Sequence, residues 1–429
     1  MPLAADLSGG VRALERLTPD GPLVLALSGG GDSMALACLM ADTAARTGQP
    51  FHALIVDHRL RAGSGEEAAF AAAQARALGA HAHTLEWDAP SPGQAAARMA
   101  RHRLLASAAR TLGARRIFLA HTAEDVIETL LMRLSRDGAG WRALAAMGAL
   151  APSPAWPEGR GLTIARPLVR TTRSALRTLL TSRGVRWAED PSNTSRAFER
   201  VRVRAAAPAA DSPAGTGLLS LNDAALRADE MVRRSASALI AAAGRIWPWG
   251  GVSLDPAAFA RVPRDVSFRA LEVLVMAVSG QARAADPAVL QSLLNAVLRG
   301  QAAGGGGVLV TRESVLGRDP GATSGRADGY RGAQSLRIRA GDCEVFDGRM
   351  LVCAGALPLT VSAFSRDNVP VAGIPARLRP SLVAIHGGDD TVIAGQDAVP
   401  GGGAAGALIA ERLAGLLDVS ADGTGREIV

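Results

Sequence analysis

The chain has 429 residues, of which 48% are hydrophobic and 20% charged, a balance typical of globular proteins rather than disordered ones. This length allows two or three domains with separate cores. No residue is lysine, so all 47 basic residues are arginine and a catalytic or Schiff-base lysine is excluded. Aromatic residues make up only 3% of the chain, so contacts with nucleic acid would depend on charge more than on ring stacking.

The three cysteines, Cys38, Cys343 and Cys353, form no C-x-x-C motif. Their spacing argues against a zinc site and against a disulfide scaffold, and it favours a reducing compartment. The first residues lack the pattern of a secretory signal, and no apolar run reaches transmembrane length. We therefore expect a cytoplasmic protein with no membrane partner.

An apolar, β-prone run over residues 23–27 stops at Ser28 and three glycines, and a helical pattern begins at Asp32 and Ser33. A buried strand that leads through a glycine loop into a helix N-terminus can bind anions, because backbone N–H groups approach a phosphate closely there. The two serines add hydroxyl donors, and Asp32 could hold a metal ion that accompanies a polyphosphate. The contiguous glycines distinguish this loop from a Walker loop and from G-x-G-x-x-G. A plain turn between strand and helix is the alternative.

Strands and helices alternate through the first half of the chain. We expect strands at 51–56, 82–85, 116–120 and 162–165, and helices at 34–46, 64–78 (opened by a capping box of Ser64 and Glu67), 94–112 and 124–135. This alternation predicts an α/β fold with a doubly wound parallel sheet, in which ligands bind at the carboxyl ends of the strands. Ser28, Asp57 and His121 each follow a predicted strand, so three polar clusters should meet at one edge of the sheet.

The second half of the chain has a different organisation. Residues 205–217 are rich in Ala, Pro, Ser and Gly and predict a linker. Beyond it, we expect helices at 218–243, 266–278 and 287–299, a short strand at 308–310, and short β-like runs from residue 336 onward. The predicted division is therefore a catalytic domain at 1–205, a mostly helical middle domain at 206–330, and a small, β-rich α+β accessory domain at 331–429.

Several motifs of the first half resemble those of one enzyme family. The loop Ser28-Gly29-Gly30-Gly31-Asp32-Ser33 matches the S-G-G-x-D-S loop of the PP-loop ATP pyrophosphatases, which cleave ATP between the α and β phosphates to adenylate a substrate. Further segments, in the family's order, are similar to those of tRNA(Ile)-lysidine synthetases: V-D-H-x-L-R at 56–61, A-R-x-x-R at 97–101, H-x-x-D-D-Q-x-E-T at 121–129, W-x-x-D-P-S-N at 187–193, and a basic tail at 200–204. After about residue 205 the resemblance is one of layout only.

Three positions depart from the family's pattern. Glu124 stands where the family usually has Asp, Val126 where it has Gln, and Val201 where an Asn normally follows the arginine. Asp125 and Glu128 match the pattern, so we expect activity, with altered hydrogen bonds around these two acids.

The resemblance implies a PP-loop, adenine nucleotide alpha hydrolase-like fold and the use of ATP with Mg²⁺. It implies that the enzyme adenylates O2 of the wobble cytidine of a tRNA(Ile) with a CAU anticodon, after which the ε-amine of free L-lysine attacks C2 and expels AMP. The loop residues 28–33 together with Asp57, His58 and His121 would bind the nucleotide, and Asp32 would hold the Mg²⁺ ion.

The residue types suit this chemistry. Arg98 and Arg101 lie three apart on one predicted helix and could contact the α-phosphate or the adenylated base; a surface arginine pair is the alternative. Free lysine has a pKa near ~10.4, so presenting its neutral amine at pH 7 costs about 4–5 kcal/mol. Asp125 and Glu128, at i, i+3 spacing, could bind the ε-ammonium and take its proton. The alternative for such acids is to stabilise the start of a helix, and both roles can hold at once. His121 could carry the proton or contact the nucleotide, with a structural role as the alternative.

A basic stretch closes the first half. From residue 160 to 204, eleven arginines stand against three acids. Arg200, Arg202 and Arg204 alternate in a way that suits a groove or strand edge lined with phosphates, so we expect them to bind the tRNA backbone; a solvated basic face is the alternative. Residues 190–193 predict a turn that directs this tail.

Three rival functions are weighed against the lysidine hypothesis. A cytidine 2-thiolase needs a cysteine pair, and amide-forming synthetases usually bring a glutaminase module with a nucleophilic cysteine; neither signal is found in the sequence, and Cys38 is predicted to be a core residue. A non-catalytic or differently specific PP-loop tRNA-binding protein is the third rival. The departures at 124, 126 and 201 favour it.

Overall fold

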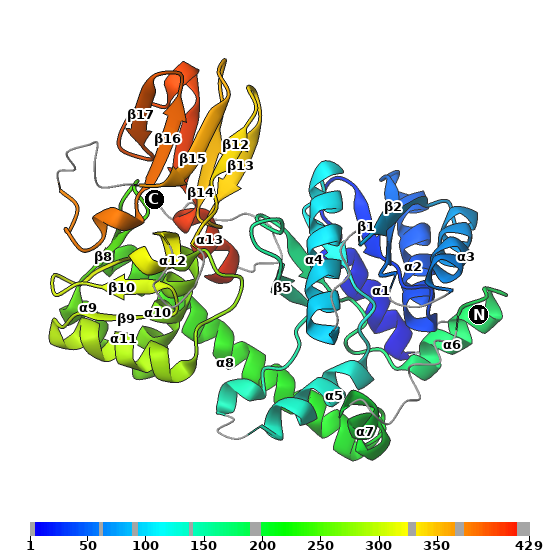
Figure 1. The fold of residues 1–429 in the computed structure, drawn as a ribbon. Coiled ribbons are helices and arrows are strands. Elements are labelled where there is room, and N and C mark those ends of the chain that lie inside the picture. Colours follow the sequence, from blue (N-terminus) through cyan, green and yellow to red (C-terminus); the bar gives the residue numbers. More distant parts are fainter. Residues whose placement is uncertain are drawn as a thin grey trace. The chain divides into compact units, whose positions relative to one another are not determined.

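The computed structural model describes residues 5–59, 63–87, 93–136, 140–188, 199–324, 332–364 and 373–417 (Figure 1). Its contacts group into two compact units, the first containing the chain up to Met231 and the second beginning at Val232. The three domains expected from the sequence stay a prediction. The predicted turn at 190–193 and the end of the V-D-H-x-L-R motif at 60–61 lie outside the described residues.

A six-stranded sheet forms the centre of the first unit. Its strands are β1 (Leu23–Ala26), β2 (Phe51–Asp57), β3 (His81–Glu86), β4 (Arg116–Phe118), β5 (Leu150–Pro152) and β6 (Thr163–Ala165). They lie in the order β3-β2-β1-β4-β6-β5, and every neighbouring pair is parallel except β5 with β6. The predicted doubly wound parallel sheet is confirmed, with one correction: its last strand is an antiparallel edge strand.

The helices of this unit are α1 (Ala5–Leu17), α2 (Gly31–Thr47), α3 (Ser64–Ala77), α4 (Gln94–Thr111), α5 (Ala123–Leu134), α6 (Arg173–Ser182) and α7 (Glu199–Ala206), with a 3-10 turn at Trp141–Ala143. The sequence analysis did not foresee α1 or α6. The predicted capping box of Ser64 and Glu67 is wrong, because Ser64 is already the first helical residue and Gly63 is the N-cap, without a side-chain cap. The Ser64 hydroxyl instead bonds to the Asp57 carboxylate.

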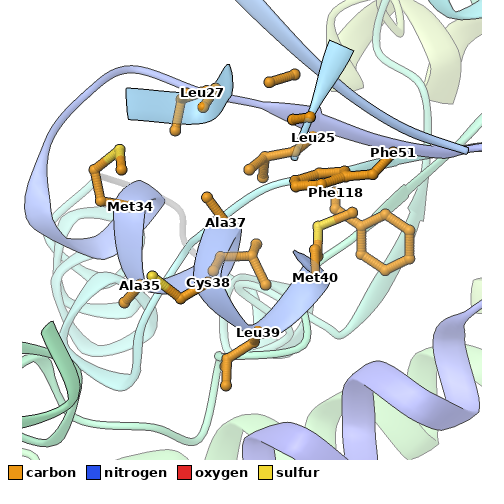
Figure 2. Packing of buried hydrophobic residues seen from close by; sticks show 14 of the residues in the cluster. Leu25, Leu27, Met34, Ala35, Ala37, Cys38, Leu39, Met40, Phe51 and Phe118 are labelled. Atoms are coloured by element: carbon orange, nitrogen blue, oxygen red, sulfur yellow. The ribbon is translucent and has the colours of Figure 1, made fainter. Parts of the chain in front are cut away.

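Apolar side chains cover both faces of the sheet, as expected of parallel strands buried between helices. Leu23 and Leu25 of β1 belong to the core that includes α2, whereas Val24 belongs to the opposite core with residues of α4. Figure 2 shows residues of α2 beneath Leu25 and Phe118, and Cys38 lies among them. Cys38 is fully buried, so the prediction that it is a core residue is confirmed.

Helix α8 (Pro213–Ala243) follows α7, and the boundary between the two units falls within it. The predicted linker at 205–217 is therefore too long. Only residues 207–212 connect α7 to α8, because the small residues after Pro213 are accommodated in the first turns of the long helix.

The second unit opens with α9 (Pro256–Arg261), α10 (Arg264–Ser279), α11 (Pro287–Arg299) and α12 (Pro320–Ser324). The helices predicted at 266–278 and 287–299 are confirmed. They accompany an antiparallel five-stranded sheet in the order β7 (Gly244–Ile246), β8 (Val252–Leu254), β11 (Val315–Arg318), β10 (Val308–Val310) and β9 (Ala303–Gly305). The predicted strand at 308–310 is confirmed as β10, whereas the sequence analysis did not foresee the other four strands.

The remaining strands form two small antiparallel sheets, which fit the predicted C-terminal α+β part. One contains β12 (Leu336–Ile338), β15 (Leu359–Ala363), β16 (Val383–Gly387) and β17 (Asp390–Ile393), and the other contains β13 (Cys343–Phe346), β14 (Met350–Cys353) and β18 (Ala404–Ala407). Short 3-10 turns at Arg379–Ser381 and Pro400–Gly402 and helix α13 (Ile409–Leu417) complete the unit. None of the helices in the described part of the chain is long and apolar enough to cross a membrane.

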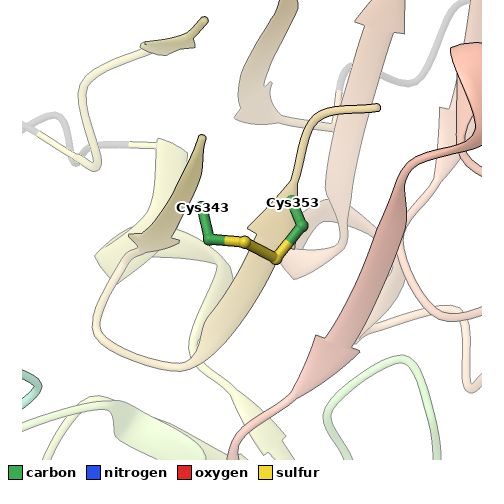
Figure 3. Close-up of a disulfide and its surroundings, with 2 residues drawn as sticks. All are labelled: Cys343 and Cys353. Carbon is green, nitrogen blue, oxygen red and sulfur yellow. A yellow bond between two sulfur atoms is a disulfide. The ribbon is translucent and has the colours of Figure 1, made fainter. Parts of the chain in front are cut away.

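The cysteine spacing argued against a disulfide scaffold, but the structure contains one disulfide. Cys343 and Cys353 are direct partners in the register of β13 with β14, their Cα atoms lie 4.0 Å apart, and a disulfide joins them (Figure 3). The two cysteines are ten positions apart in the sequence, and the spacing alone does not predict their proximity, because the pairing is set by the register of the hairpin.

Candidate active site

A cavity of about 580 Å³ opens at the carboxyl ends of β1, β2 and β4. Its polar lining comes from the loop after β1, from the end of β2, from the segment after β4 and from the neighbouring helices. The polar lining residues are Ser28, Asp32, Ser33, Asp57, His58, Ser64, Glu67, Arg101 and His121. The three strand-end clusters expected from the sequence thus border one cavity. Arg98 is not among the lining residues, although it lies on the same helix as Arg101.

The glycine loop is shaped by its own backbone and by two serines. Gly29 has φ +81°, and an added Cβ there would lie 3.2 Å from the Cβ of Ala71 in α3, so the position requires glycine. Ser33 Oγ donates to the carbonyl of Gly30 at 2.9 Å, and the Ser28 N–H donates to Ser33 Oγ at 3.3 Å. Gly30, the N-cap of α2, makes no side-chain cap bond. A helix N-terminus built in this way favours a polyphosphate.

The W-x-x-D-P-S-N segment begins beside this loop. The Ala188 N–H donates to the Gly29 carbonyl at 2.9 Å, and Gly30 and Ala188 form an isolated parallel bridge. An added Cβ on Gly31 would lie 3.5 Å from the Trp187 ring. The start of the segment therefore supports the loop, whereas residues 189–193 lie outside the described part of the chain.

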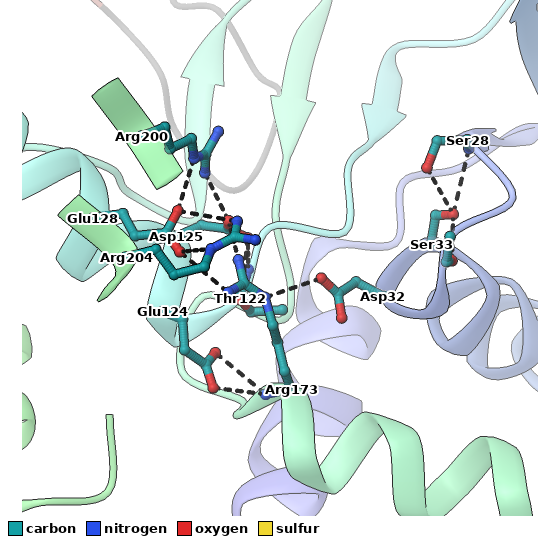
Figure 4. A network of polar contacts seen from close by, with 11 residues as sticks. Ser28, Asp32, Ser33, Thr122, Glu124, Asp125, Glu128, Arg173, Arg200 and Arg204 are labelled. Atoms are coloured by element: carbon teal, nitrogen blue, oxygen red, sulfur yellow. Dashed lines mark hydrogen bonds and ion pairs between the residues drawn. The ribbon is translucent and has the colours of Figure 1, made fainter. Parts of the chain in front are cut away.

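Asp125 and Glu128 lie at the start of α5 within a network of charges (Figure 4). One oxygen of Asp125 accepts from the Thr122 N–H at 2.8 Å and completes a capping box, so the helix-stabilising alternative holds. Its other oxygen accepts from Arg173 at 2.6 Å and from Arg200 at 2.7 Å. Glu128, with a side chain only 1% exposed, accepts from Arg200 Nε and Arg204 Nε, both at 2.7 Å.

Arg173 was missed by sequence reasoning. It is the first residue of α6, and its guanidinium bonds to three carboxylates: to Asp32 at 3.3 Å, to Asp125 at 2.6 Å and to Glu128 at 3.1 Å. Its backbone N–H donates to Glu124 at 2.9 Å. In sequence it is one of eleven arginines in a basic stretch, and nothing in the local pattern singles it out.

The charges around these acids set their ionisation. Burial alone would raise the pKa of Asp125 and of Glu128, but the contacting arginines outweigh it and the pKa of both acids is lowered. The pKa of Asp32 is raised, chiefly by burial and further by the charge of Asp125, with Arg173 opposing the shift. Burial therefore outweighs the ion pair with Arg173 at Asp32, and a bound cation would stabilise the ionised form of this carboxylate.

The cavity also contains cationic and imidazole nitrogens that are ready for a ligand. Within the described residues, Arg101 Nε, His58 Nδ1 and His121 Nδ1 are buried atoms without a hydrogen-bond partner. Burial, together with the charge of Arg166, lowers the pKa of His121 to about 3, so its ring is neutral at pH 7. Burial and the charges of Arg98 and Arg200 lower the pKa of Arg101. Several positive charges close together, with nitrogen atoms that make no hydrogen bond, are typical of a site that binds a polyanion.

The predicted arrangement of the basic tail needs a correction. Arg200, Arg202 and Arg204 lie on helix α7, not along a strand edge. Because residues i and i+4 share a helix face, Arg200 and Arg204 point together toward the acids of α5, whereas Arg202 is exposed.

The departures from the family pattern are partly explained. Glu124 reaches the backbone of Arg173, and Val126 is buried in a core with Ile127 and Leu219. Nothing in the structure explains Val201.

The glycine loop at a strand end, the cavity beside it and the parallel sheet define a PP-loop nucleotide-binding domain, and the family model of that domain matches residues 11–209. Over 371 residues the chain is 35% identical to the tRNA(Ile)-lysidine synthase of Caulobacter vibrioides, covering 85% of this chain and 81% of that protein. It is 37% identical over 287 residues to that of Hyphomonas neptunium (65% and 75% covered) and 41% identical over 268 residues to that of a Bradyrhizobium species (58% and 72%). The chain belongs to the tRNA(Ile)-lysidine synthase family, as its motifs predicted.

Proposed function

We propose that this chain is an ATP-dependent tRNA(Ile)-lysidine synthase, a carbon–nitrogen ligase of the cytoplasm. It joins free L-lysine to C2 of the wobble cytidine in a CAU-anticodon tRNA(Ile) and releases AMP and pyrophosphate. The observation that carries this proposal is the single guanidinium of Arg173, which contacts both Asp32 beside the glycine loop and Asp125 of the acid pair. A phosphate-binding loop and a pair of ionised acids are thereby parts of one site.

The nucleotide is held at the glycine loop. The amides at the start of α2 with Ser28 and Ser33 bind the β and γ phosphates, and Arg101 with His121 faces the α-phosphate or the base. Asp32 would hold a Mg²⁺ ion, because it lines the cavity beside the glycine loop, and a carboxylate together with phosphate oxygens is the donor set that this ion prefers. Such an ion would supply positive charge to the phosphate oxygens of the bound nucleotide.

Asp125 and Glu128 bind the ε-ammonium of lysine and take its proton as the amine attacks. Both acids are ionised at neutral pH, which the binding of an ammonium requires. Their arginine partners occupy the same oxygens in the absence of substrate. Lysine therefore replaces Arg200 and Arg204, and these two arginines move to the tRNA phosphates for which their charge suits them.

The target base must leave the anticodon stack to reach the cavity, as in other enzymes that act on a base. Arg202, exposed on α7, contributes a contact to the tRNA backbone, and Arg98, on the same helix as Arg101, contacts the adenylated base. The structure offers no argument for a thiolase at this site. The cysteine pair belongs to the second unit and is joined in a disulfide, and no cysteine is among the residues that line the described cavity.

The test is incorporation of labelled lysine into a tRNA(Ile) transcript. We expect lysine- and ATP-dependent labelling of the CAU transcript with release of AMP, and none of a transcript whose wobble cytidine is replaced by uridine. Binding of the CAU transcript without labelling would favour the alternative, a non-catalytic PP-loop tRNA-binding protein.

A further inference from the structure

Arg173 is the one residue whose side chain joins the glycine-loop helix to the acid pair among the contacts of the described residues. Its three nitrogens bond to carboxylates of α2 and α5, at positions far apart in the sequence (Figure 4). A lysine at this position could not make the same set of bonds, because its ammonium is a compact point donor and not a planar fork. The contacts therefore use a property specific to arginine.

The position of Arg173 is unfavourable for the helix that carries it. A cation at the first residue of α6 opposes the helix dipole, which favours acids at that end of a helix. The helix is capped by Thr172, which accepts from the Ala175 N–H, so α6 has no need of Arg173 for its own start. Folding of α6 alone does not explain an arginine at this point.

Arg173 is also less exposed than the other two arginines of the cluster. Its side chain is 21% exposed, against 36% for Arg200 and 37% for Arg204. Its backbone N–H is held by Glu124, and the Ala123 N–H donates to the carbonyl of Thr171, so the loop before α6 is fixed to α5 on both sides of the site. Arg173 is thus built into the scaffold of the site.

We propose that Arg173 is a positioning residue for the lysine-transfer step: it holds Asp125 and Glu128 at a fixed distance from Asp32 and so aligns the bound amine with the adenylated base. This assignment rests on the proposed function. The assignment predicts opposite effects of Arg173 on lysine binding and on the rate of lysine transfer. Arg173 is a cation that contacts the same acids as the substrate ammonium, so it opposes lysine binding while it supports catalysis.

The test uses the full chain with Arg173→Gln and Arg173→Lys. We expect Arg173→Gln to lower kcat for lysine incorporation about 100-fold, as for a displacement of about 1 Å at a reacting centre, while the KM for lysine falls because a competing cation is removed. Equilibrium dialysis with labelled lysine and tRNA should show tighter binding than in the wild type. Arg173→Lys should recover part of kcat, because it restores the charge. Arg183→Gln is the matched control: it removes a charge from the C-terminal end of the same helix, where Arg183 pairs with Asp42.

A purely structural role predicts a different result. Loss of folded protein would lower the active fraction and leave both KM values unchanged, with a parallel change in thermal unfolding. A kcat within threefold of the wild type, a KM for lysine that stays equal or rises as kcat falls, or no advantage of Lys over Gln would overturn the assignment. If the wild type itself incorporates no lysine, the proposed function fails, and the assignment of Arg173 to lysine transfer fails with it.

Discussion

If the substrate lysine displaces the side chains of Arg200 and Arg204 from the acid pair, the loss in lysine affinity can be calculated. Arg200 and Arg204 both donate to Glu128 at 2.7 Å, and Arg200 also donates to Asp125 at 2.7 Å. A hydrogen bond to a charged group contributes about 1.5–3 kcal/mol. If lysine must displace contacts worth about 2 kcal/mol, its affinity in the absence of tRNA is reduced about 30-fold.

The perturbation is the double variant Arg200→Gln, Arg204→Gln, measured by equilibrium dialysis of labelled lysine without ATP, so that no chemistry occurs. In the wild type, we expect added CAU transcript to tighten lysine binding about 30-fold, since tRNA phosphates draw the arginines away. In the variant, lysine should bind tightly without tRNA and gain nothing when tRNA is added. Arg183→Gln should behave as the wild type.

For the same variant, the slope of the logarithm of the tRNA binding constant against the logarithm of salt concentration should be smaller in magnitude by about one to two. Adding Arg202→Gln should reduce the magnitude of this slope further. The reasoning is refuted if the double variant binds lysine more weakly than the wild type, which would make the arginines part of the lysine site. It is also refuted if tRNA tightens lysine binding equally in both proteins. An unchanged salt slope would remove α7 from the tRNA interface.

Three further predictions concern the acid pair, the glycine loop and the buried histidines. Asp125→Asn keeps an oxygen to cap α5 but loses the charge, so the KM for lysine should rise tenfold to 100-fold (about 1.5–3 kcal/mol) with little change in the KM for ATP; equal rises would contradict the assigned role. Gly29→Ala should raise the KM for ATP about tenfold, because a left-handed alanine costs about 1–2 kcal/mol, whereas Gly48→Ala, at φ +72° beyond the other end of α2, should lower only the melting temperature. The pKa of buried His102 is lowered to about 3, chiefly by burial, so the unfolded state binds a proton near pH 6.5 that the folded state refuses. Stability should fall by about 2 kcal/mol for this residue between pH 7 and pH 5 in denaturant titrations, and His102→Gln should abolish that share; an unchanged pH slope would show that the ring is already charged in the fold.

The parts of the site that the sequence predicted correctly are those set by local pattern. The apolar runs of β1, β2 and β4 are buried on both faces and are followed by polar residues, so the residue pattern alone was enough to place Ser28, Asp57 and His121 at strand ends. The order of motifs then predicted the family. No comparable pattern was available for the antiparallel sheets of the second unit, whose strands are mostly three to five residues long.

The parts that were missed depend on contacts between distant segments. Arg173 meets Asp32 across 141 positions, and its role is invisible until α6 is placed beside α2 and α5. The tail from Arg200 to Arg204 alternates basic and apolar residues, a pattern that fits a strand, yet the i, i+4 spacing of its outer arginines equally fits one face of a helix. Tertiary contact with α5 decides between the two.

The use of arginine around the acid pair has a chemical consequence for the proposed reaction. Glu128 is almost fully buried, and an ionised acid pair at such a place needs cationic partners when no substrate is bound. Because the chain contains no lysine, these partners are arginine guanidinium groups. A guanidinium stays protonated in proteins and cannot attack an activated base, whereas a lysine in the same place would present the very amine that the substrate supplies. Arginine can therefore hold Asp125 and Glu128 in their ionised form without competing as a nucleophile. The arginines and the substrate lysine bind to the same two acids, but only the lysine can lose a proton and attack the activated base.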